Sequence, residues 1–501
     1  MSTEFNPNRT TSNHQSRRTF LKTSVALGTL STLGAGVSIA SKAKASAATH
    51  SFTLTVEDVG GRQSYDGKTL GPTMRVKAGD TLDVELINTL PPLHDDCTDN
   101  HNQRHGLNTT NLHTHGLHVS PYMDSSGTID ADNIFVSVVP EGQIVACEEV
   151  CGVEVKSHFR HGRNAFRFEL PENHASGTFW YHAHKHGSTA PQVSDGLAGA
   201  LIVEDPAGFM PSYIEEAEEK VLFITDDAVL LVNDDGSAEP VEDLIMRPGE
   251  VQRWRVINGT GDGTEFVFVR PNIGNLEMHL IAFDGLTLPK RVPVDYEHED
   301  EPWLNPSALS SGNRADFIVR APQAAKDGPG LVSTFLDAVI GPDILRYVNI
   351  DVNFEGAPVV AAWSDDTALP GPGHLPFDET PLPKREIAFT RRQTVDGEPF
   401  NGEIMQSMKL NTAEEWTVGN NTQQLHVYHI HVNPFLVTQI NGQTLAEDDP
   451  LRRWQDTIGV PLNGSIGLKT RFETFTGKFV IHCHVLPHED GGMMQIVEVV
   501  D

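Results

Sequence analysis

The chain has 501 residues, of which 38% are hydrophobic, with 43 glycines and 31 prolines. This length predicts two to four domains, and the composition is typical of a loop-rich globular protein, which excludes a disordered or a membrane chain. The formal net charge of −31 argues against nucleic acid as a partner, because a polyanion would be repelled; it is compatible with a solvated acidic surface or with cationic substrates.

The N-terminus carries the pattern of an export signal. Paired arginines, Arg17-Arg18, precede a mildly apolar run from Thr23 to Ala40, and alternate alanines then suit a cleavage site. The run is rich in Gly, Ser and Thr, and no later stretch reaches transmembrane length, so we expect no stable membrane span in the mature chain. Residues 1–47 are therefore predicted to be a twin-arginine signal peptide. The expected partner is the twin-arginine export machinery, and the expected location is periplasmic or secreted.

The mature region predicts many short strands and few helices. Apolar residues alternate with polar ones from Phe52 to Val56 and again from Leu82 to Leu86, which is typical of half-buried strands. Pro and Gly recur at intervals that suit sandwiches or barrels. The best helical candidate, Ser212 to Lys220, is short. The pattern therefore favours an all-β fold.

Two internal repeats divide this region. One pattern, a Met that opens a strand and an Asn that closes the next, covers residues 74–88, 246–258 and 408–420, at a spacing that suits one sandwich domain. In the second repeat, the segment from Gly177 to His184 lies 300 residues before the similar segment from Gly477 to His484, and this offset is constant along both segments. We therefore predict three related β-sandwich domains.

The expected boundaries follow from these repeats. The first domain covers residues 48–206, the second 207–355 and the third 384–501, and the Pro-rich residues 356–383 form the linker before the third. The middle unit has no His-x-His motif. We therefore expect metal chemistry in the two outer domains and a spacing role for the middle one.

Four His-x-His pairs carry the chemistry of the chain. Alternate residues of a strand point to the same side, so each pair presents two imidazoles to one face. Eight imidazoles suit several copper ions; zinc is the rival metal, but a zinc site needs about four ligands. The pairs are His113/His115, His182/His184, His429/His431 and His482/His484.

Cys483 lies between two of these histidines and must point to the opposite face of its strand. His488 and Met493 follow it in the pattern Cys-x4-His-x4-Met, and His426 precedes His429 by three residues. Two His, one Cys and a weak axial Met are the ligands of a blue-copper electron-transfer site. Met494 is a rival axial ligand, although the count from Cys483 favours Met493.

Three further cysteines, Cys97, Cys147 and Cys151, leave an odd thiol if one disulfide forms. Their pairing stays open. The residues from Leu93 to His105, which include His94 and His101 among several aspartates, form either an acidic surface loop, which we favour, or an accessory metal site.

The four histidine motifs resemble those of the three-domain multicopper oxidases, the laccase-like family in its bacterial form. The resemblance covers the whole mature region and implies an all-β fold of three consecutive cupredoxin-like Greek-key β-sandwich domains. The motifs are His113-Thr114-His115-Gly116, Trp180-Tyr181-His182-Ala183-His184, His426-Val427-Tyr428-His429-Ile430-His431, and His482-Cys483-His484 through His488 to Met493. The sequence departs from the family where Val427 replaces the usual Pro after His426.

The resemblance also implies which residues hold each of four copper ions. The type 1 copper would be bound by His426, Cys483, His488 and Met493, and the type 2 copper by His113 and His429. The two type 3 coppers would be bound by His115, His182, His184, His431, His482 and His484. The type 2 and type 3 ions form a trinuclear cluster that would lie between the first and third domains.

A multicopper oxidase oxidises four substrate equivalents, one electron at a time, and reduces dioxygen to water. That reduction consumes protons, so buried carboxylates are expected near the cluster as acids. Glu489, directly after His488, and Asp124, eleven residues beyond His113, match positions where bacterial relatives carry such carboxylates.

The electron donor stays open between two classes. Phenols or aromatic amines are favoured, because the ten methionines show no Met-rich insertion of the kind that cuprous oxidases often carry. A metallo-oxidase acting on Mn(II) or Cu(I) is the alternative. A copper nitrite reductase or a non-enzymatic copper protein is more distant, because neither explains all eight paired histidines.

Overall fold

The computed structural model describes the chain from residue 47 onward with several gaps. The segment 47–501 forms one compact unit. The structure is 47% strand and 5% helix, which confirms the all-β prediction. Residues 1–46 of the predicted signal peptide and Cys97, Cys147 and Cys151 lie outside the described residues. The described ranges are 47–93, 100–144, 159–241, 243–261, 266–271, 276–294, 301–323, 333–340, 344–373, 377 and 381–501.

The first third of the described chain folds into two four-stranded sheets, with strand orders β2-β1-β4-β8 and β3-β10-β9-β5. Leu54 and Phe166 of one sheet share a buried cluster with Met74 and Phe179 of the other, so the two sheets form a sandwich. A short pair, β6 and β7, and one helix, α1 (Thr189–Asp195), accompany them. The strands are β1 (Thr49–Val59), β2 (Arg62–Tyr65), β3 (Met74–Val76), β4 (Thr81–Asn88), β5 (His113–His115), β6 (Ser137–Val139), β7 (Phe159–His161), β8 (Arg163–Glu169), β9 (Gly177–His182) and β10 (Ala198–Val203).

The middle third forms a second sandwich, with sheet orders β13-β12-β11-β15-β20-β17-β18 and β14-β22-β21-β16-β19. Trp254 of the first sheet and Met246 of the second lie in its core. The strands are β11 (Glu218–Ile224), β12 (Val229–Val232), β13 (Ala238–Pro240), β14 (Asp243–Met246), β15 (Val251–Asn258), β16 (Phe266–Pro271), β17 (Glu277–Phe283), β18 (Leu286–Pro293), β19 (Ala308–Leu309), β20 (Arg314–Arg320), β21 (Ser333–Ile340) and β22 (Ile344–Phe354).

The last third forms the third sandwich, with sheet orders β24-β23-β26-β32-β28-β29 and β25-β34-β33-β27-β31; β30 pairs with β28. A short helix, α3 (Leu486–Asp490), follows β33. The strands are β23 (Lys384–Thr390), β24 (Thr394–Val395), β25 (Ile404–Lys409), β26 (Thr412–Asn420), β27 (His426–Ile430), β28 (Phe435–Ile440), β29 (Gln443–Thr444), β30 (Trp454–Gln455), β31 (Thr457–Val460), β32 (Ser465–Phe472), β33 (Gly477–Cys483) and β34 (Met494–Val500).

The internal repeat has a structural counterpart in each sandwich. Its first strand, β3, β14 or β25, pairs in parallel with the closing strand of one sheet, and the chain then crosses to β4, β15 or β26 in the other sheet. The alternation predicted from Leu82 to Leu86 is confirmed, because every second residue of β4 is buried. The exact domain boundaries and the 356–383 linker stay predictions.

The helix expected from Ser212 to Lys220 is wrong in its second half. Helix α2 covers only Ser212–Glu215, and residues from Glu218 onward belong to β11. The buried run Val221 to Ile224 explains the difference, because these residues pair with β12 and β15 inside the middle sandwich. Within the described ranges, no helix combines the length and the apolarity needed to cross a membrane.

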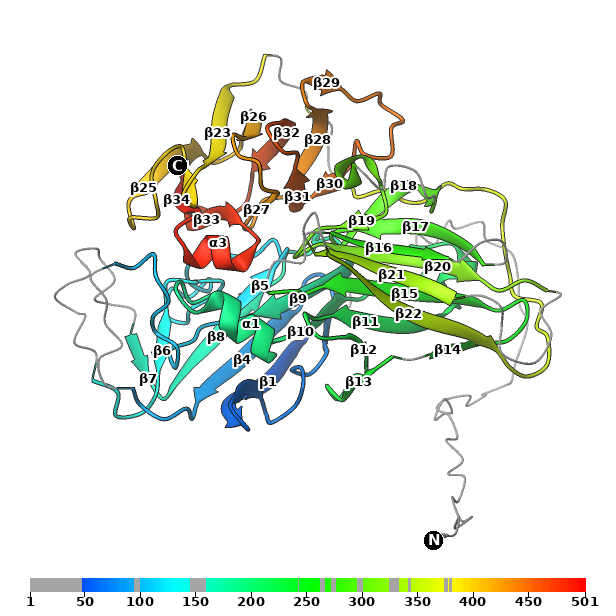
Figure 1. Cartoon of the computed structure of the whole chain (residues 1–501), viewed down its shortest axis with the longest axis horizontal. Coiled ribbons are helices and arrows are strands. Elements are labelled where there is room, and N and C mark those ends of the chain that lie inside the picture. Colours follow the sequence, from blue (N-terminus) through cyan, green and yellow to red (C-terminus); the bar gives the residue numbers. More distant parts are fainter. Residues whose placement is uncertain are drawn as a thin grey trace, which may run out of the picture. The chain divides into compact units, whose positions relative to one another are not determined.

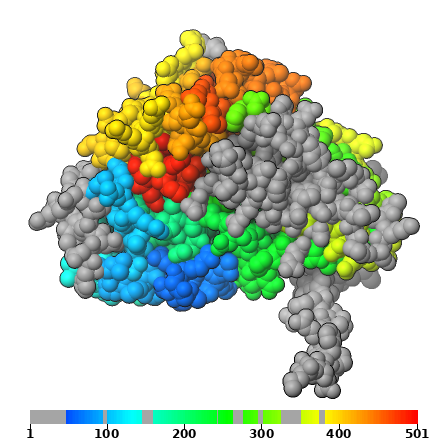
Figure 2. All heavy atoms as spheres, viewed as in Figure 1, coloured from blue at the N-terminus to red at the C-terminus, as the bar shows by residue number. Residues whose placement is uncertain are grey.

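The first and third sandwiches meet along the strands that carry the histidine pairs. Helix α3 packs against α1 of the first sandwich, as Figure 1 shows. In Figure 2 the red C-terminal segment adjoins the cyan and green-cyan surface of the first sandwich. The site described below therefore lies where two sandwiches join.

A buried ion network joins the first and middle sandwiches. Asp316 accepts hydrogen bonds from Arg253 at 2.7 Å and from Arg255 at 2.8 Å, and Arg255 also donates to the Thr178 hydroxyl at 2.9 Å. The side chains of all three charged residues are at most 6% exposed. Each charge therefore depends on its partners, because water does not solvate it.

We predict that Asp316→Ala lowers the free energy of unfolding by about 3–5 kcal/mol, because it removes the buried carboxylate that two buried guanidinium groups share. Arg253 then keeps only Asp205 as a partner, and Arg255 keeps only Glu219. Chemical denaturation followed by fluorescence measures the change. Glu85→Ala is the matched control, because it removes an ion pair with Arg163 that is exposed on both sides and should contribute little. Equal stability of the two variants would contradict the prediction.

Candidate metal centre

The eight paired histidines come together where β5 and β9 of the first sandwich face β27 and β33 of the third. His113 lies opposite His182 on paired strands, and His429 lies opposite His482 in the same way. Rings from the two sandwiches also stack on each other: His113 on His431 and His115 on His429, each with ring centroids 3.8 Å apart. The strand alternation expected from the sequence therefore produces one joint cluster.

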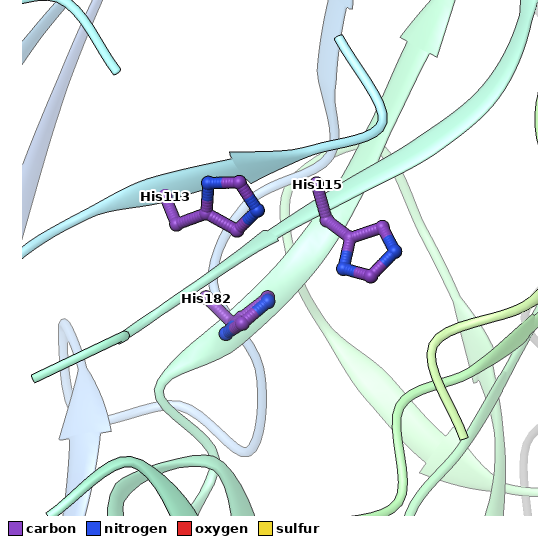
Figure 3. Close-up of side chains that lie close together, drawn as sticks. All are labelled: His113, His115 and His182. Carbon is purple, nitrogen blue, oxygen red and sulfur yellow. The ribbon is translucent and has the colours of Figure 1, made fainter. Parts of the chain in front are cut away.

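The histidines lie close enough together to form a site for several metal ions. Figure 3 shows His113 and His115 on β5 beside His182 on β9, and one ligand atom from each of the three rings lies within 4.8 Å of the others. His184, His431 and His482 form a second such group, and His113, His429 and His431 a third. All eight rings are at most 1% exposed.

Three of the rings are oriented by outward hydrogen bonds, each of which leaves the other ring nitrogen directed at the cluster. Three rings donate their Nδ1–H group: His113 to the Asp132 carboxylate at 3.0 Å, His182 to the Ala183 carbonyl at 2.9 Å, and His429 to the Asp456 carbonyl at 2.9 Å. The Nε2 atoms of these three rings are buried and have no hydrogen-bond partner among the described residues. Buried nitrogens of this kind fit metal ions, whose histidine ligands are usually held by such outer partners.

The protonation of the cluster supports the same conclusion. Burial is the largest cause that lowers the pKa of seven of the eight rings, and mutual repulsion between neighbouring rings adds to it. The rings are therefore neutral at pH 7, and each can offer a lone pair. The seven are His113, His115, His182, His184, His431, His482 and His484.

The predicted blue-copper ligands form a second site on the other face of β33. The Cys483 Sγ atom lies 3.6 Å from Nδ1 of His426 and 3.7 Å from Nδ1 of His488. Burial lowers the pKa of His426 to about 3 and that of His488 to about 4, so both rings are neutral. Cys483 is itself fully buried, whereas His488 is partly exposed. One thiol and two imidazoles thus converge, as a type 1 copper requires.

The packing separates the two candidate axial ligands. Met493 lies in the same hydrophobic cluster as Cys483, and the two residues are also joined by a backbone hydrogen bond of 3.0 Å. Met494 packs in a different cluster, with Ile134 and Val480. The structure therefore favours Met493, as the count from Cys483 does.

The departure at Val427 leaves the motif intact. β27 runs without interruption from His426 to Ile430, and Tyr428 fills the core against Phe389 and Phe435. The Val427 carbonyl accepts a backbone hydrogen bond from His484 at 2.7 Å, which ties the strand to the cluster. The missing proline therefore does not displace His426.

Glu489 lies directly behind the cluster. Its Oε2 atom is 3.3 Å from Nδ1 of His482, and its Oε1 atom is 3.5 Å from Nδ1 of His184. The Thr189 hydroxyl, from α1, donates to Oε1 at 3.0 Å. Glu489 is fully buried, and this burial raises its pKa well above the ordinary value. The predicted carboxylate thus contacts two rings of one histidine group.

Asp124 does not have the surroundings that the sequence suggested. Its carboxylate accepts hydrogen bonds from the Ser126 hydroxyl and from the backbone of Thr128 and Ile129, so it holds its own loop together. The carboxylate that contacts His113 is Asp132, whose pKa is raised by burial to about 7. Asp124 was chosen by its position eleven residues beyond His113. Such a count does not show where the loop turns back towards His113, and so it missed Asp132.

Sequence reasoning also missed contacts from the middle sandwich. Ser311 lies 3.1 Å from Nδ1 of His484, and Arg314 pairs with Asp456, which in turn contacts His115 at 3.2 Å. Burial alone would raise the pKa of Asp456, but the charge and hydrogen bonds of Arg314 hold that pKa below its ordinary value. The middle unit therefore contributes contacts to the cluster that the expected spacing role did not include. Charged residues at the start of an otherwise apolar strand, β20, were the available signal.

Residues 94–99 of the loop from Leu93 to His105, which include His94, lie outside the described residues. The His105 ring lies 5.8 Å from that of His101 and 6.2 Å from that of His186. Burial and, to a smaller extent, the positive charge of Lys185 lower the pKa of His105 to about 4. Because a neighbouring cation also opposes metal binding, this part of the loop does not favour an accessory metal site.

We predict that Asp132→Asn weakens the metal affinity of the cluster roughly 10- to 100-fold, the usual effect of losing an outer partner of a ligating histidine. An amide at this position cannot accept from His113 as strongly as a carboxylate. Metal content after dialysis against graded chelator measures the effect. Asp124→Asn is the matched control and should retain its metal; loss of metal from Asp124→Asn alone would contradict the prediction.

Comparison with known proteins agrees with this geometry. Two family models, both described as multicopper oxidase, match residues 374–501 and 153–208. The chain is 25% identical over 463 residues to the multicopper oxidase mco of Staphylococcus aureus, covering 87% of this chain and 83% of that protein. It is 24% identical over 504 residues to a laccase of Bacillus subtilis, with 87% and 90% covered.

The fold also matches solved structures. A multicopper oxidase from Campylobacter jejuni, described as a metallo-oxidase, superposes with a TM-score of 0.62 at 20% identity, over 90% of this chain and 92% of that one. These neighbours consist of three cupredoxin-like domains, which confirms the predicted fold class. The two domain models, the relatives matched over most of their length and the convergent ligand sets together support a laccase-like multicopper oxidase, a copper-dependent oxidoreductase that uses dioxygen.

Proposed function

We propose that this protein is a laccase-like oxidase that couples the one-electron oxidation of four equivalents of a phenol or aromatic amine to the four-electron reduction of dioxygen to water. The observation that carries the proposal is the position of Cys483. Its thiol belongs to the group with His426 and His488, while the residues on either side of it, His482 and His484, belong to the eight-histidine cluster. One strand thus serves two metal sites.

The residues present fit four copper ions. The thiol group with Met493 would hold the type 1 copper, and His113 with His429 the type 2 copper. The other six histidines of the cluster would hold the type 3 pair. Copper bound in these two places supplies one-electron oxidation of the donor and reduction of dioxygen.

The chain itself supplies the connection between the two sites. Covalent bonds lead from the Cys483 side chain through the backbone to both neighbouring histidines, and the whole path is buried. The partly exposed His488 is the ligand nearest to solvent, so a donor approaches there. Glu489, behind His184 and His482, is placed to hold a proton at Oε2, which has no hydrogen-bond partner among the described residues.

An organic donor remains the favoured substrate class. The relatives differ on this point, since one is named a laccase and another is described as a metallo-oxidase. The ten methionines form no Met-rich insertion, which supports an organic donor over Cu(I). Oxidation of Mn(II) is the second candidate, favoured by the net charge of −31.

The proposal extends to the place of action. The paired arginines and the apolar run that follows support export by the twin-arginine machinery, and hence a periplasmic or secreted protein. Export in the folded state would let the chain receive copper before it leaves the cytoplasm.

We predict about four copper ions per chain in the loaded protein, with one dioxygen consumed for every four electrons taken from a phenolic dye. Cys483→Ser should lose the blue absorption and one copper while the cluster keeps the rest, because the two ligand sets share no side chain. Metal analysis and an oxygen electrode measure both quantities. One copper per chain without oxygen uptake would identify an electron carrier instead.

Steady-state rates with a phenol, Mn(II) and Cu(I) on one preparation then rank the donors.

We predict that Glu489→Gln slows oxygen reduction by 10²- to 10⁴-fold, the usual contribution of a positioned acid, and leaves the blue absorption unchanged. The amide keeps the hydrogen bond from Thr189 but cannot deliver a proton. Reoxidation of the fully reduced protein, followed by stopped flow, isolates this half of the reaction. A reoxidation rate equal to that of the parent protein would exclude Glu489 as proton donor.

A further inference from the structure

The turn before β20 brings the middle sandwich into contact with the histidine cluster. Gly312 has a φ of +89°, and a side chain there would place its Cβ 3.0 Å from Cε1 of His115 and 3.1 Å from Cδ2 of His484. Such contacts are tighter than side chains normally make. A backbone segment of the middle sandwich therefore packs directly against one histidine from each outer sandwich.

Ser311 fixes which nitrogen of His484 faces the cluster. The Ser311 hydroxyl donates its own hydrogen to the Thr260 carbonyl at 2.7 Å, so towards His484, at 3.1 Å, it acts as an acceptor. Nδ1 of His484 must then carry the hydrogen, and its Nε2, which has no hydrogen-bond partner among the described residues, keeps the lone pair. Both Ser311 and Thr260 belong to the middle sandwich.

Arg314 acts on two further histidines through Asp456. Its guanidinium forms a two-point pair with the carboxylate, Nη1 to Oδ1 at 2.8 Å and Nη2 to Oδ2 at 2.6 Å. Oδ1 of Asp456 accepts from Nε2 of His115 at 3.2 Å, and the Asp456 backbone carbonyl accepts from Nδ1 of His429 at 2.9 Å. The side chains of Arg314 and Asp456 are 0% and 5% exposed.

The Arg314–Asp456 pair holds the His115 and His429 rings by different nitrogens. His115 is held by Nε2, so its Nδ1 is the buried nitrogen left without a hydrogen-bond partner among the described residues; for His429 the reverse holds. The hydroxyl of Thr457 supports both rings, at 3.1 Å from His115 and 2.9 Å from His429. A ring that rotated by half a turn would lose its outer partner and present a hydrogen to the metal.

We propose that the middle sandwich supplies positioning residues for the oxygen-reducing cluster, Ser311 acting on His484 and Arg314 acting through Asp456 on His115 and His429. This inference rests on the proposed function, because it takes the cluster to hold copper. It assigns the middle unit a role in copper retention that its lack of His-x-His motifs did not suggest.

The test compares copper retention in variants of the full-length, copper-loaded protein. Ser311→Ala and Arg314→Gln remove the proposed contacts. Ser310→Ala is the matched control for the first, because this neighbouring buried hydroxyl bonds to Asn313. Arg253→Gln is the control for the second, because it breaks a buried ion pair of 2.7 Å with Asp316 in the same sandwich.

We expect Ser311→Ala and Arg314→Gln to keep the blue absorption but to release copper from the cluster at 10- to 100-fold lower chelator concentration than the parent. The type 2 signal in electron paramagnetic resonance should shift in Arg314→Gln, and Arg314→Lys should recover part of the retention. The two controls should retain copper like the parent, even where the melting temperature of Arg253→Gln falls as far as that of Arg314→Gln.

Two results would overturn the proposal: parent-like retention in Ser311→Ala and Arg314→Gln, or equal copper loss in Arg253→Gln at an equal melting temperature. If Arg314→Gln fails to fold, Ser311→Ala and its control decide, since they differ from the parent by one hydroxyl each. A parent protein that itself holds only one copper would refute the proposed function, and this outcome is distinct from both.

Discussion

Strand β33 constrains this molecule more than any other element, because successive side chains of a strand must point to opposite faces. Cys483 is therefore directed into the core of the third sandwich, towards His426 and His488, while His482 is directed at the first sandwich. The distance between the two metal sites is thereby fixed by covalent geometry and does not depend on how the sandwiches dock. The packing of the first sandwich against the third determines whether the histidines on β5 and β9 lie beside those of the third sandwich.

The second requirement is that neutral rings stand close together before any metal is present. Stacked and edge-on ring contacts between the sandwiches, such as His113 on His431, bury the rings without charging them. Outward hydrogen bonds to Asp132 and Asp456, together with the contact between Glu489 and His482, then restrict rotation of the rings. A preorganised site of this kind binds metal without a large ordering cost.

The sequence sufficed for the features that depend on local periodicity. The three repeats, the strand character around Leu82 and Leu86, and the opposed faces of Cys483 and its neighbours all follow from spacing along a single strand. Asp132 could not be found this way, because the chain between His113 and Asp132 is irregular and its path depends on tertiary contacts. Arg314 was missed for a stronger reason: its partner Asp456 lies 142 positions later and in another sandwich.

The distribution of the ligands along the chain has a consequence for how the protein assembles. Hydrogen bonds at the cluster join residues 298 to 342 positions apart, such as His184 with His482 and His115 with Thr457. Closing so long a loop costs little more free energy than closing a short one, because the entropy grows only with the logarithm of loop length. Contacts of such sequence separation nevertheless form slowly. During synthesis, most of the chain must therefore emerge before any ligand group that draws on both outer sandwiches can close.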